Sequence, residues 1–384
     1  MSDVLFEITK DNLETGLRGY PVGYCPTSTV DPVNGLFYSG QPVEELAFRQ
    51  PEEVIFLLYH GREPNKQELD EFKKDLANRS HLSEDVVRHI YQLPRQGHPM
   101  DLLCSALFIC GMFENTNDYR EDCLNLIAQI PEITATVINH HGGWGATKPS
   151  KPELGYMENF AQMLNIPNIT PQLTLILKLF NILHYDHGGG NLSTFVGKAV
   201  ASGLEHMYGS ISASMAALAG PRHGKANQDC LTFVKEVLEQ LGEKATAEQV
   251  EELIRKRLAN NELIFGFGHA VLRVEDPRAT VLYRTAEENY PNHPLVKIAT
   301  LLRTVGPKVL KENPKISSPY PNVDAISGVL LTAAGLPYPE YYTVLFGLSR
   351  VVGIAIQIVY ERCEARDGKG TPIVRPKYIF KPRT

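Results

Sequence analysis

Apolar side chains recur every three to four positions along most of the chain, the spacing that gathers them on one face of a helix. The pattern predicts a charged amphipathic helix over residues 66–79 and apolar helices over residues 101–113 and 172–184. Residues 232–260 are predicted to form two amphipathic helices around Gly242, because glycine is common where a helix ends.

Capping signals support these helices, whereas strand signals are scarce. Thr246 stands directly before the second helix of this pair, where a threonine side chain caps the first turn. Alternation with a period of two is confined to short N-terminal pieces such as residues 36–38. The run of Ser, Ala and Gly over residues 209–220 would let helices, or two subunits, approach each other closely. The predicted fold class is therefore all-α, mainly helical.

The longest apolar stretch, residues 343–360, is long enough to look like a membrane span. Arg350 stands near its middle, where a charge is costly in lipid. We therefore interpret the stretch as a fully buried helix and expect no membrane partner. A buried arginine needs an anion, so Arg350 becomes a candidate ligand for an anionic substrate.

Length and charge limit the architecture and the partners. At 384 residues the chain exceeds one comfortable hydrophobic core, so two domains are expected. Lys and Arg total 38 against 44 Asp and Glu, a formal charge of −6 that gives no reason to expect nucleic acid as a partner. An anionic ligand must then be held by a local cluster of arginine and histidine.

The N-terminal sequence MSDVLFEITKDN contains acidic side chains early and lacks the apolar core of a signal peptide. It is also not rich in arginine and poor in acids, as a mitochondrial presequence would be. These features lead us to expect a cytoplasmic protein.

Two candidate segments carry histidines beside glycine-rich turns. In HYDHGGGNLSTF, residues 184–195, an apolar helix is expected to end in a loop with two histidines and a carboxylate. A structural turn and a metal site are the alternatives there, but no further Cys or His cluster has ligand spacing, and we expect no metal. In GPRHGKANQ, residues 220–228, His223 lies on a backbone stiffened by proline. Such fixing suits a general acid or a hydrogen-bond donor, although a lone histidine is often structural.

A third segment, FGFGHAVLRVEDPR over residues 265–278, combines glycines with cations. Its two glycines would let the backbone approach a ligand closely. His269, Arg273 and Arg278 then supply one hydrogen-bond donor and two positive charges for an anion.

The fourth segment, YPNVDAISGVLL over residues 320–331, places Asp324 directly before an apolar helical run. One interpretation is a helix cap, a position that aspartate favours. The other is a carboxylate base that is partly shielded from water. The sequence alone leaves both open.

Taken together, the four segments resemble the citrate synthase family in their order and separations. Further matching pieces are LRGYPV from Leu17, HPM from His98, FGLSR ending at Arg350 and RPK from Arg375. The resemblance covers nearly the whole chain, and the ordered set is more specific than any one piece. It implies a mainly helical fold with a large domain of residues 1–222 plus 336–384 and a small domain of residues 223–335.

The resemblance also implies residue roles. Asp324 matches the base that removes a proton from the acyl-CoA α-carbon, and His223 matches the group that stabilises the resulting enol or enolate. His269 matches the donor that polarises the keto group of oxaloacetate, and Ser193 matches the hydroxyl that orients His223. His187, Arg278 and Arg350 match the oxaloacetate ligands, and Asn191 and Ser193 belong to the same substrate-binding set. Arg375 matches the arginine that the neighbouring subunit contributes. Arg18 and Arg273 match the contacts to the coenzyme A phosphates.

The implied partners are oxaloacetate and acetyl-CoA, with the coenzyme A thioester acting as a substrate and no permanently bound cofactor. The implied assembly is a homodimer with shared active sites, serving the tricarboxylic acid cycle. One departure from the family is Asn139, which stands where some relatives supply a cation to the coenzyme A phosphates of the partner subunit. His140, His141 and Lys148 are the candidates to replace that cation.

The expected reaction is condensation of acetyl-CoA with oxaloacetate, followed by hydrolysis of citryl-CoA to citrate and coenzyme A. The alternative is a 2-methylcitrate synthase, which uses propionyl-CoA with the same core residues. A citryl-CoA lyase or a non-catalytic coenzyme A-binding homologue is disfavoured, because Asp324 and His269 are both present.

Overall fold

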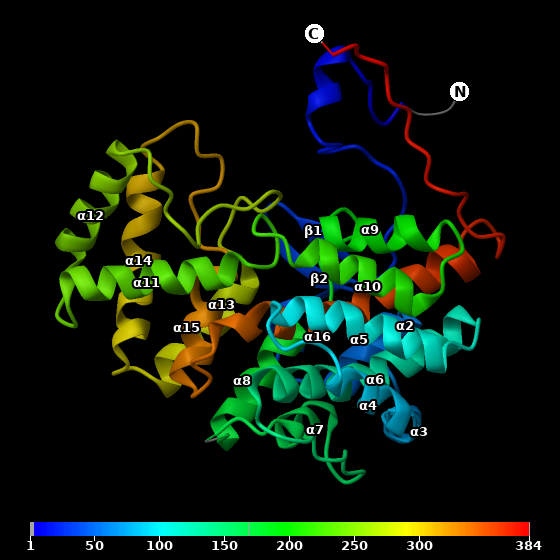
Figure 1. Ribbon diagram of the computed structural model, residues 1–384. Coiled ribbons are helices and arrows are strands. Elements are labelled where there is room, and N and C mark those ends of the chain that lie inside the picture. Colours follow the sequence, from blue (N-terminus) through cyan, green and yellow to red (C-terminus); the bar gives the residue numbers. More distant parts are fainter. Residues whose placement is uncertain (1–3, 168, 384) are drawn as a thin grey trace.

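The computed structural model describes residues 4–167 and 169–383, and this part of the chain is dominated by α-helices (Figure 1). The helices up to the middle of the chain are α1 (Val43–Leu46), α2 (Pro51–His60), α3 (Lys66–Arg79), α4 (Glu84–Tyr91), α5 (Pro99–Glu114), α6 (Tyr119–Gly142), α7 (Tyr156–Met163), α8 (Pro171–Leu183), α9 (Leu192–Ala201) and α10 (Met207–Leu218). Those that follow are α11 (Ala226–Leu241), α12 (Ala247–Ala259), α13 (Pro277–Asn289), α14 (Pro294–Leu310), α15 (Asp324–Ala333) and α16 (Tyr342–Val359).

Short elements complete the chain. Two 3₁₀ turns, η1 and η2, cover Lys10–Glu14 and Pro339–Tyr341, and a π-helical turn, η3, covers Tyr360–Glu364. The strands β1 (Ser28–Asp31), β2 (Gly35–Tyr38) and β3 (Gln41–Pro42) form a three-stranded antiparallel sheet in that order. The prediction of a mainly helical fold with short N-terminal strands is confirmed.

The predicted helix ends agree with the sequence signals that located them. Helix α3 has the predicted bounds, and Gly242 ends α11 with a positive φ of 76°. The Thr246 side chain accepts a hydrogen bond from the Gln249 amide at 3.4 Å, which caps α12. Helix α11 begins at Ala226, six residues before the predicted start, because the apolar face continues through Cys230 and Leu231.

Helix α16 is the central core helix, as its uninterrupted apolar sequence predicts. The continuous helical stretch of Pro339–Glu364 is long and apolar enough to cross a membrane, but its most apolar part is buried inside the fold. It packs against α6, α8, α9 and α10, and Arg350 is only 2% exposed.

The small residues of α10 serve a contact within the chain. Helices α9 and α10 lie so close that a Cβ atom on Gly197 would collide with Ser214. This approach fixes α9, whose first turn carries Ser193, against the core.

Helices α11 to α15 pack on one another and form a group at one side of the molecule, at the left in Figure 1. The remaining helices and the sheet form a larger group around α16. Residues 220–225 connect the larger group to the group of α11 to α15, whereas residues 265–276 connect α12 to α13 within the latter.

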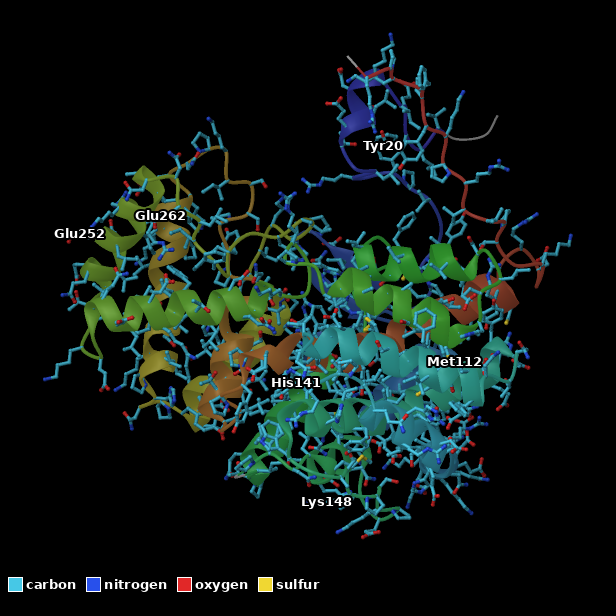
Figure 2. All side chains as sticks on the ribbon, viewed as in Figure 1. Tyr20, Met112, His141, Lys148, Glu252 and Glu262 are labelled. Atoms are coloured by element: carbon cyan, nitrogen blue, oxygen red, sulfur yellow. The ribbon has the colours of Figure 1, made fainter. Side chains whose placement is uncertain are left out.

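The two terminal segments, residues 4–24 and 371–383, form an arm that leaves the helical body (Figures 1 and 2, where Tyr20 lies on it). Phe6 packs against Tyr20 with ring centroids 4.6 Å apart, and Lys381 lies 3.8 Å from Glu14. Apolar side chains along this arm are strongly exposed: Val4, Leu5, Ile8, Val22, Tyr24, Ile373, Tyr378, Ile379 and Phe380. A monomer therefore leaves a large apolar surface uncovered.

Candidate active site

An isolated β-bridge between Phe267 and Pro321 joins the third candidate segment to the fourth. The Gly268 amide donates to the Tyr320 carbonyl at 3.1 Å, and the Asn322 amide donates to the Gly266 carbonyl at 2.9 Å. The bridge sets the backbones before His269 and Asp324 side by side, although the two residues are far apart in sequence.

Gly266 is needed at this junction for a different reason from the one expected. Its φ is 83°, and a Cβ atom there would lie 2.8 Å from Cys230 Sγ and 2.9 Å from Ala325 Cα. We expected the backbone at Gly266 to approach a ligand, but in the structure it approaches helices α11 and α15. The glycine allows the loop to pack against the helix that carries Asp324.

His269 is held as a neutral hydrogen-bond donor. Its Nδ1 atom accepts hydrogen bonds from the amides of Val271 at 3.0 Å and Leu272 at 2.9 Å. An amide can only donate, so the proton of the neutral ring lies on Nε2. Burial, aided by the charge of Arg278, lowers the pKa of His269 to about 4 and keeps the ring neutral near pH 7.

His223 has the opposite tautomer, set by Ser193 at the start of α9. The Ser193 amide lies 3.3 Å from His223 Nε2, and Ser193 Oγ lies 3.0 Å from the same atom. Because the amide can only donate, Nε2 accepts and Nδ1 carries the proton. Burial lowers the pKa of His223 to about 4, with Arg350 acting in the same direction. Ser193 Oγ also lies 2.9 Å from Asn191 Oδ1, so its single proton is shared between this oxygen and His223 Nε2.

Asp324 is the first residue of α15, and it does not cap the helix. Its amide donates to Asn322 Oδ1 at 3.0 Å, while its carboxylate receives no hydrogen bond from the described residues. Burial raises the pKa of Asp324 to about 6, although the charge of Arg278 opposes the rise. A carboxylate with a raised pKa and open lone pairs is suited to accept a proton.

Arg278 is buried in a two-bond ion pair that the sequence analysis missed. Its Nε and Nη2 atoms donate to the two carboxylate oxygens of Asp276 at 3.0 and 2.7 Å. Asp276 also caps α13, whose first residue is Pro277. The signal was present in the sequence Asp-Pro-Arg, since Asp before Pro marks a helix start. The pair orients Arg278 and leaves its Nη1 group unbonded by the described residues.

Arg350 is the second buried arginine, and no carboxylate of the described residues lies within ion-pair distance of it. Its Nε donates to the His184 carbonyl at 3.0 Å, and its guanidinium lies 4.8 Å from the Phe346 ring centre. Burial lowers the pKa of Arg350 to about 10, well above physiological pH, so the group stays charged. A buried charge of this kind needs an anion from outside the chain.

The two histidines of the first segment have different environments. His184 stacks on Phe180 at 4.1 Å between ring centroids and lies 2.7 Å from the Phe180 carbonyl through Nδ1, so it is a structural residue. His187 instead has a buried Nε2 atom without a hydrogen-bond partner among the described residues. Its ring lies 5.1 Å from that of His269. The structure therefore brings His187, His269, Arg278 and Arg350 toward one place.

Three predicted residues lie apart from this place. Arg18 and Arg375 are exposed on the terminal arm. Arg273 turns its guanidinium onto its own loop and donates to the carbonyls of Val271 and Leu272, both at 2.9 Å.

Asn139, the position that departs from the family pattern, lies inside the protein. Asn139 is fully buried, and its Nδ2 donates to the Met163 carbonyl at 2.9 Å. His140 is held at the Leu93 carbonyl, and His141 at the Tyr341 hydroxyl. Lys148 is the exposed member of the three candidate replacements. Within residues 4–167 and 169–383, no cluster of three or more potential metal ligands occurs.

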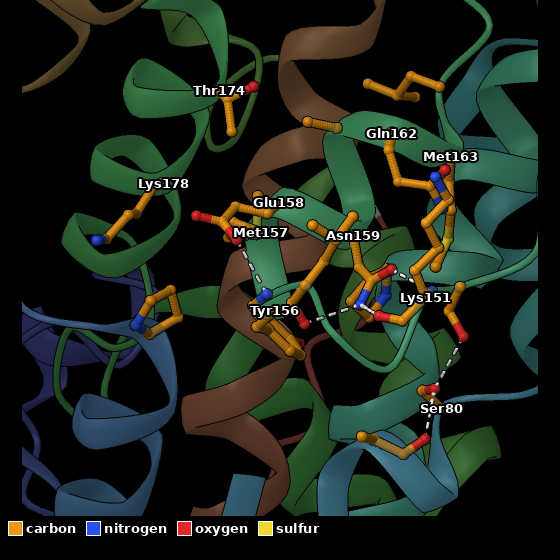
Figure 3. Close-up of a pocket in the computed structure, with 18 of the residues that line it drawn as sticks. Ser80, Lys151, Tyr156, Met157, Glu158, Asn159, Gln162, Met163, Thr174 and Lys178 are labelled. Carbon is orange, nitrogen blue, oxygen red and sulfur yellow. Dashed lines mark hydrogen bonds between the residues drawn. The ribbon is translucent and has the colours of Figure 1, made fainter. Parts of the chain in front are cut away.

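Figure 3 shows a separate groove along α7 and α8. Labelled side chains such as Lys151, Glu158 and Lys178 line it, together with residues of α3 and of the loop before α7. The predicted catalytic and oxaloacetate-binding residues are not among its lining residues.

A family model described as the C-terminal domain of citrate synthase matches residues 16–377. The chain belongs to the citrate synthase family. Curated relatives include citrate synthase 4 of Arabidopsis thaliana, 36% identical over 98% of this chain and 83% of the relative, and citrate synthase of Citrus maxima, 35% identical with the same coverage.

Solved citrate synthase structures share the fold. The enzyme of Thermotoga maritima aligns with a TM-score of 0.81 at 28% identity, covering 96% of both chains. A ternary complex of the Thermoplasma acidophilum citrate synthase with carboxymethyl coenzyme A and oxaloacetate aligns with a TM-score of 0.83 at 28% identity, again over 96% of both chains. These comparisons confirm the predicted family, fold class and enzyme class, an acyltransferase. The family uses coenzyme A thioesters as substrates without a permanently bound cofactor.

The expectation of a cytoplasmic protein is wrong. Six curated relatives, from plants and animals, are all named as mitochondrial citrate synthases. The expectation rested only on the composition of the first residues. That composition does not report the compartment, because targeting segments are removed from mature proteins.

Proposed function

We propose that this member of the citrate synthase family is a citrate synthase, which condenses acetyl-CoA with oxaloacetate and hydrolyses citryl-CoA. The observation that carries the proposal is the buried Arg350, which has no ion-pair partner among the described residues, together with His187 Nε2, which has no hydrogen-bond partner among them. Oxaloacetate has two carboxylates, and arginine pairs with a carboxylate through two parallel hydrogen bonds. Arg278, oriented by Asp276 with Nη1 open, is the ligand for the other carboxylate.

The two neutral histidines suit the two carbonyl groups of the reaction. A thioester α-carbon is a far weaker acid than a carboxylic acid, so Asp324 can remove its proton only if the developing oxygen charge is stabilised. His223 Nδ1–H would donate to that oxygen, a contribution of about 10² to 10³ in rate for one positioned donor. His269 Nε2–H would donate to the keto oxygen of oxaloacetate and make the keto carbon electrophilic.

The carbon–carbon bond then forms between the enol carbon and the keto carbon. The proton removed by Asp324 first stays on its carboxyl group, while the former keto oxygen takes the proton of His269 Nε2–H and becomes the citryl hydroxyl. The proton on Asp324 then returns to His269 through water, so the condensation neither consumes nor releases a proton. Water next hydrolyses the thioester of citryl-CoA and releases citrate and coenzyme A. A pKa near 6 lets Asp324 accept the proton and still release it near pH 7.

We further propose two domains, residues 1–222 plus 336–384 and residues 223–335, that close on oxaloacetate. His187, Ser193 and Arg350 belong to the first, whereas His269, Arg278 and Asp324 belong to the second. Closure would bring Asp324, His223 and His269 of the second domain against oxaloacetate held by the first domain only after oxaloacetate binds, which protects acyl-CoA from idle hydrolysis.

A homodimer is the third part of the proposal. The homodimer is supported by the exposed apolar side chains of the terminal arm, such as Tyr24 at 82%, Tyr378 at 90% and Phe380 at 88% exposed. A second copy of the chain would bury them. Arg375 lies on this arm and would then reach the neighbouring subunit's active site, as the family resemblance implies. Arg18 and Arg273 are proposed for the coenzyme A phosphates, and Arg273 must leave its own loop carbonyls to bind them.

The test is the oxaloacetate-dependent release of coenzyme A thiol from acetyl-CoA, with propionyl-CoA in parallel. We expect a higher kcat/KM for acetyl-CoA. One methylene is worth only about 1–3 kcal/mol in an apolar pocket, so some turnover of propionyl-CoA is also expected. A higher kcat/KM for propionyl-CoA would instead identify a 2-methylcitrate synthase, and no thiol from either substrate would refute both.

A further inference from the structure

Asp186 is a fully buried carboxylate directly before His187, and the proposed chemistry does not use it. Its Oδ1 accepts from the His187 amide at 2.9 Å and from Gln357 Nε2 at 2.9 Å. Its Oδ2 accepts from Ser28 Oγ at 2.8 Å and from the hydroxyl of Thr27. A carboxylate has about four lone-pair sites, so these four donors saturate it.

This saturation keeps Asp186 away from the neighbouring cation. Arg350 lies near enough for the charge of Asp186 to raise the arginine pKa against the effect of burial, yet the two residues form no ion pair. The guanidinium Nη groups of Arg350 consequently remain available for a substrate carboxylate. Asp186 thus offsets part of the buried positive charge without occupying the anion site.

Two glycines provide the space that this arrangement needs. A Cβ atom on Gly353, one turn after Arg350 in α16, would lie 2.6 Å from Asp186 Cγ. A Cβ atom on Gly189 would lie 3.1 Å from Lys198 Nζ and 3.2 Å from Gln357 Oε1. The loop after His187 can therefore lie directly on α9 and α16.

A buried ion pair orients the amide of Gln357. Lys198 Nζ lies 3.0 Å from Glu361 Oε1 and 3.3 Å from Gln357 Oε1. Since an ammonium group can only donate, the oxygen of Gln357 faces Lys198 and its NH₂ group faces Asp186. These residues form a continuous series of hydrogen bonds from Glu361 through Lys198 and Gln357 to Asp186 and the His187 amide. In each bond a donor faces an acceptor.

We propose that Asp186 is a positioning residue for oxaloacetate binding, which acts by fixing the backbone of His187 and is itself oriented by Thr27, Ser28 and Gln357. The inference rests on the proposed function, because His187 is taken as an oxaloacetate ligand there. It assigns no contact with substrate to Asp186. The expected consequence of disturbing it is weaker oxaloacetate binding, with the acyl-CoA site little affected.

The first test compares Asp186→Ala with Asp186→Asn in the full-length protein. Asp186→Ala removes every acceptor, and we expect the Kd and KM for oxaloacetate to rise about tenfold or more, the loss typical of hydrogen bonds to a charged group. Asp186→Asn keeps one acceptor oxygen for the His187 amide and for Gln357, and its NH₂ group can donate to the two hydroxyls. We expect it to restore oxaloacetate binding to within about threefold of wild type, with the KM for acetyl-CoA unchanged in both variants.

The second test is Thr27→Val, which keeps the shape of a side chain that is 1% exposed and removes one donor to Asp186. We expect a rise of about threefold to tenfold in the Kd for oxaloacetate, measured by calorimetry. Thr285→Val is the matched control, since that buried hydroxyl bonds only within α13, to the Val281 carbonyl. The control should leave the Kd unchanged.

The outcomes separate this inference from the function on which it rests. A wild-type protein without oxaloacetate-dependent thiol release refutes the proposed function. An active wild type whose Thr27→Val and Asp186→Ala variants bind oxaloacetate normally refutes the positioning role. Equal losses for oxaloacetate and acetyl-CoA, without rescue by Asp186→Asn, also refute it and assign Asp186 a general structural role.

Discussion

At the scale of single residues, the environment of each side chain decides between its functional and its structural interpretation. His184 and His187 are three positions apart, yet one bonds to its own helix and the other presents an unpartnered nitrogen. Asp324 stands at a helix start like a capping residue, but its carboxylate caps nothing. Sequence spacing located these residues, whereas their tautomers and open lone pairs depend on contacts with distant segments.

Asp324→Asn should abolish turnover and preserve oxaloacetate binding. The substitution keeps the shape and removes the base, and we expect kcat to fall by about 10³ or more, within the range for a lost general base. Thiol release measures kcat, and calorimetry measures oxaloacetate binding. Asp70→Asn on the exposed face of α3 is the control. Turnover within tenfold of wild type would assign the base elsewhere.

The acid limb of the pH–rate profile should report Asp324. Burial raises its pKa to about 6 in the fold, from 3.8, and only the ionised form accepts a proton. The rate should therefore fall as the pH drops through about 6, while His223 and His269, with pKa values near 4, stay neutral over that range. A profile of kcat against pH with oxaloacetate saturating checks this. An acid midpoint at or below pH 4.5 would contradict it.

At the scale of elements, helix α16 is a core helix with a buried charge, Arg350, for which we propose a substrate carboxylate as the partner. Every residue from Tyr342 to Val359 except Phe346 is buried, and this side chain packs beneath the guanidinium of Arg350. A charge with no ion-pair partner destabilises the empty fold, because ions are costly to bury. Under the proposed function, the substrate supplies the counter-ion of this charge.

Arg350→Met should separate stability from function. The apolar side chain fills similar space, and replacing a buried charge is often neutral or stabilising by about 1–4 kcal/mol. We expect an equal or higher Tm without ligand, and loss of the Tm increase that oxaloacetate gives the wild type. Thermal unfolding with and without oxaloacetate measures both. A large drop in the ligand-free Tm would show that Arg350 is a structural residue.

Much of the helical framework could be predicted from periodicity and caps, as α3, α8 and α16 show, since apolar spacing and terminal residues are local signals. The site could be predicted only in part. The family resemblance supplied His223 and Asp324, but the pair of Arg278 with Asp276 and the hydrogen bonds around Asp186 join segments that only the tertiary fold brings together. No local pattern reports such contacts.

At the scale of the whole molecule, the site is assembled from distant parts of the chain. In the larger group, the loop between α8 and α9 carries His187, α9 carries Ser193 and α16 carries Arg350, whereas α15 of the other group carries Asp324. The terminal arm, which leaves the helical body, carries an exposed apolar surface and Arg375. We therefore propose that a complete active site needs two copies of the chain.

Mixing two inactive variants tests this shared arrangement. Arg375→Ala and Asp324→Asn should each be nearly inactive as homodimers. In a mixed dimer, the Arg375→Ala subunit keeps its own Asp324 and receives the partner's Arg375, so one site is intact. Unfolding and refolding the equimolar mixture should recover about a quarter of wild-type activity, if the subunits pair at random. A mixture no more active than its components, with mixed dimers verified by mass spectrometry, would contradict a shared site.

The most direct test of the central claim follows the bond that the enzyme is proposed to make. Acetyl-CoA labelled with ¹³C in its methyl group is incubated with oxaloacetate and the protein, and carbon NMR identifies the product. The account predicts citrate labelled in one methylene carbon, formed by the wild type and absent with Asp324→Asn. Labelled acetate, or unreacted acetyl-CoA, would show that His223, His269 and Asp324 do not perform the condensation.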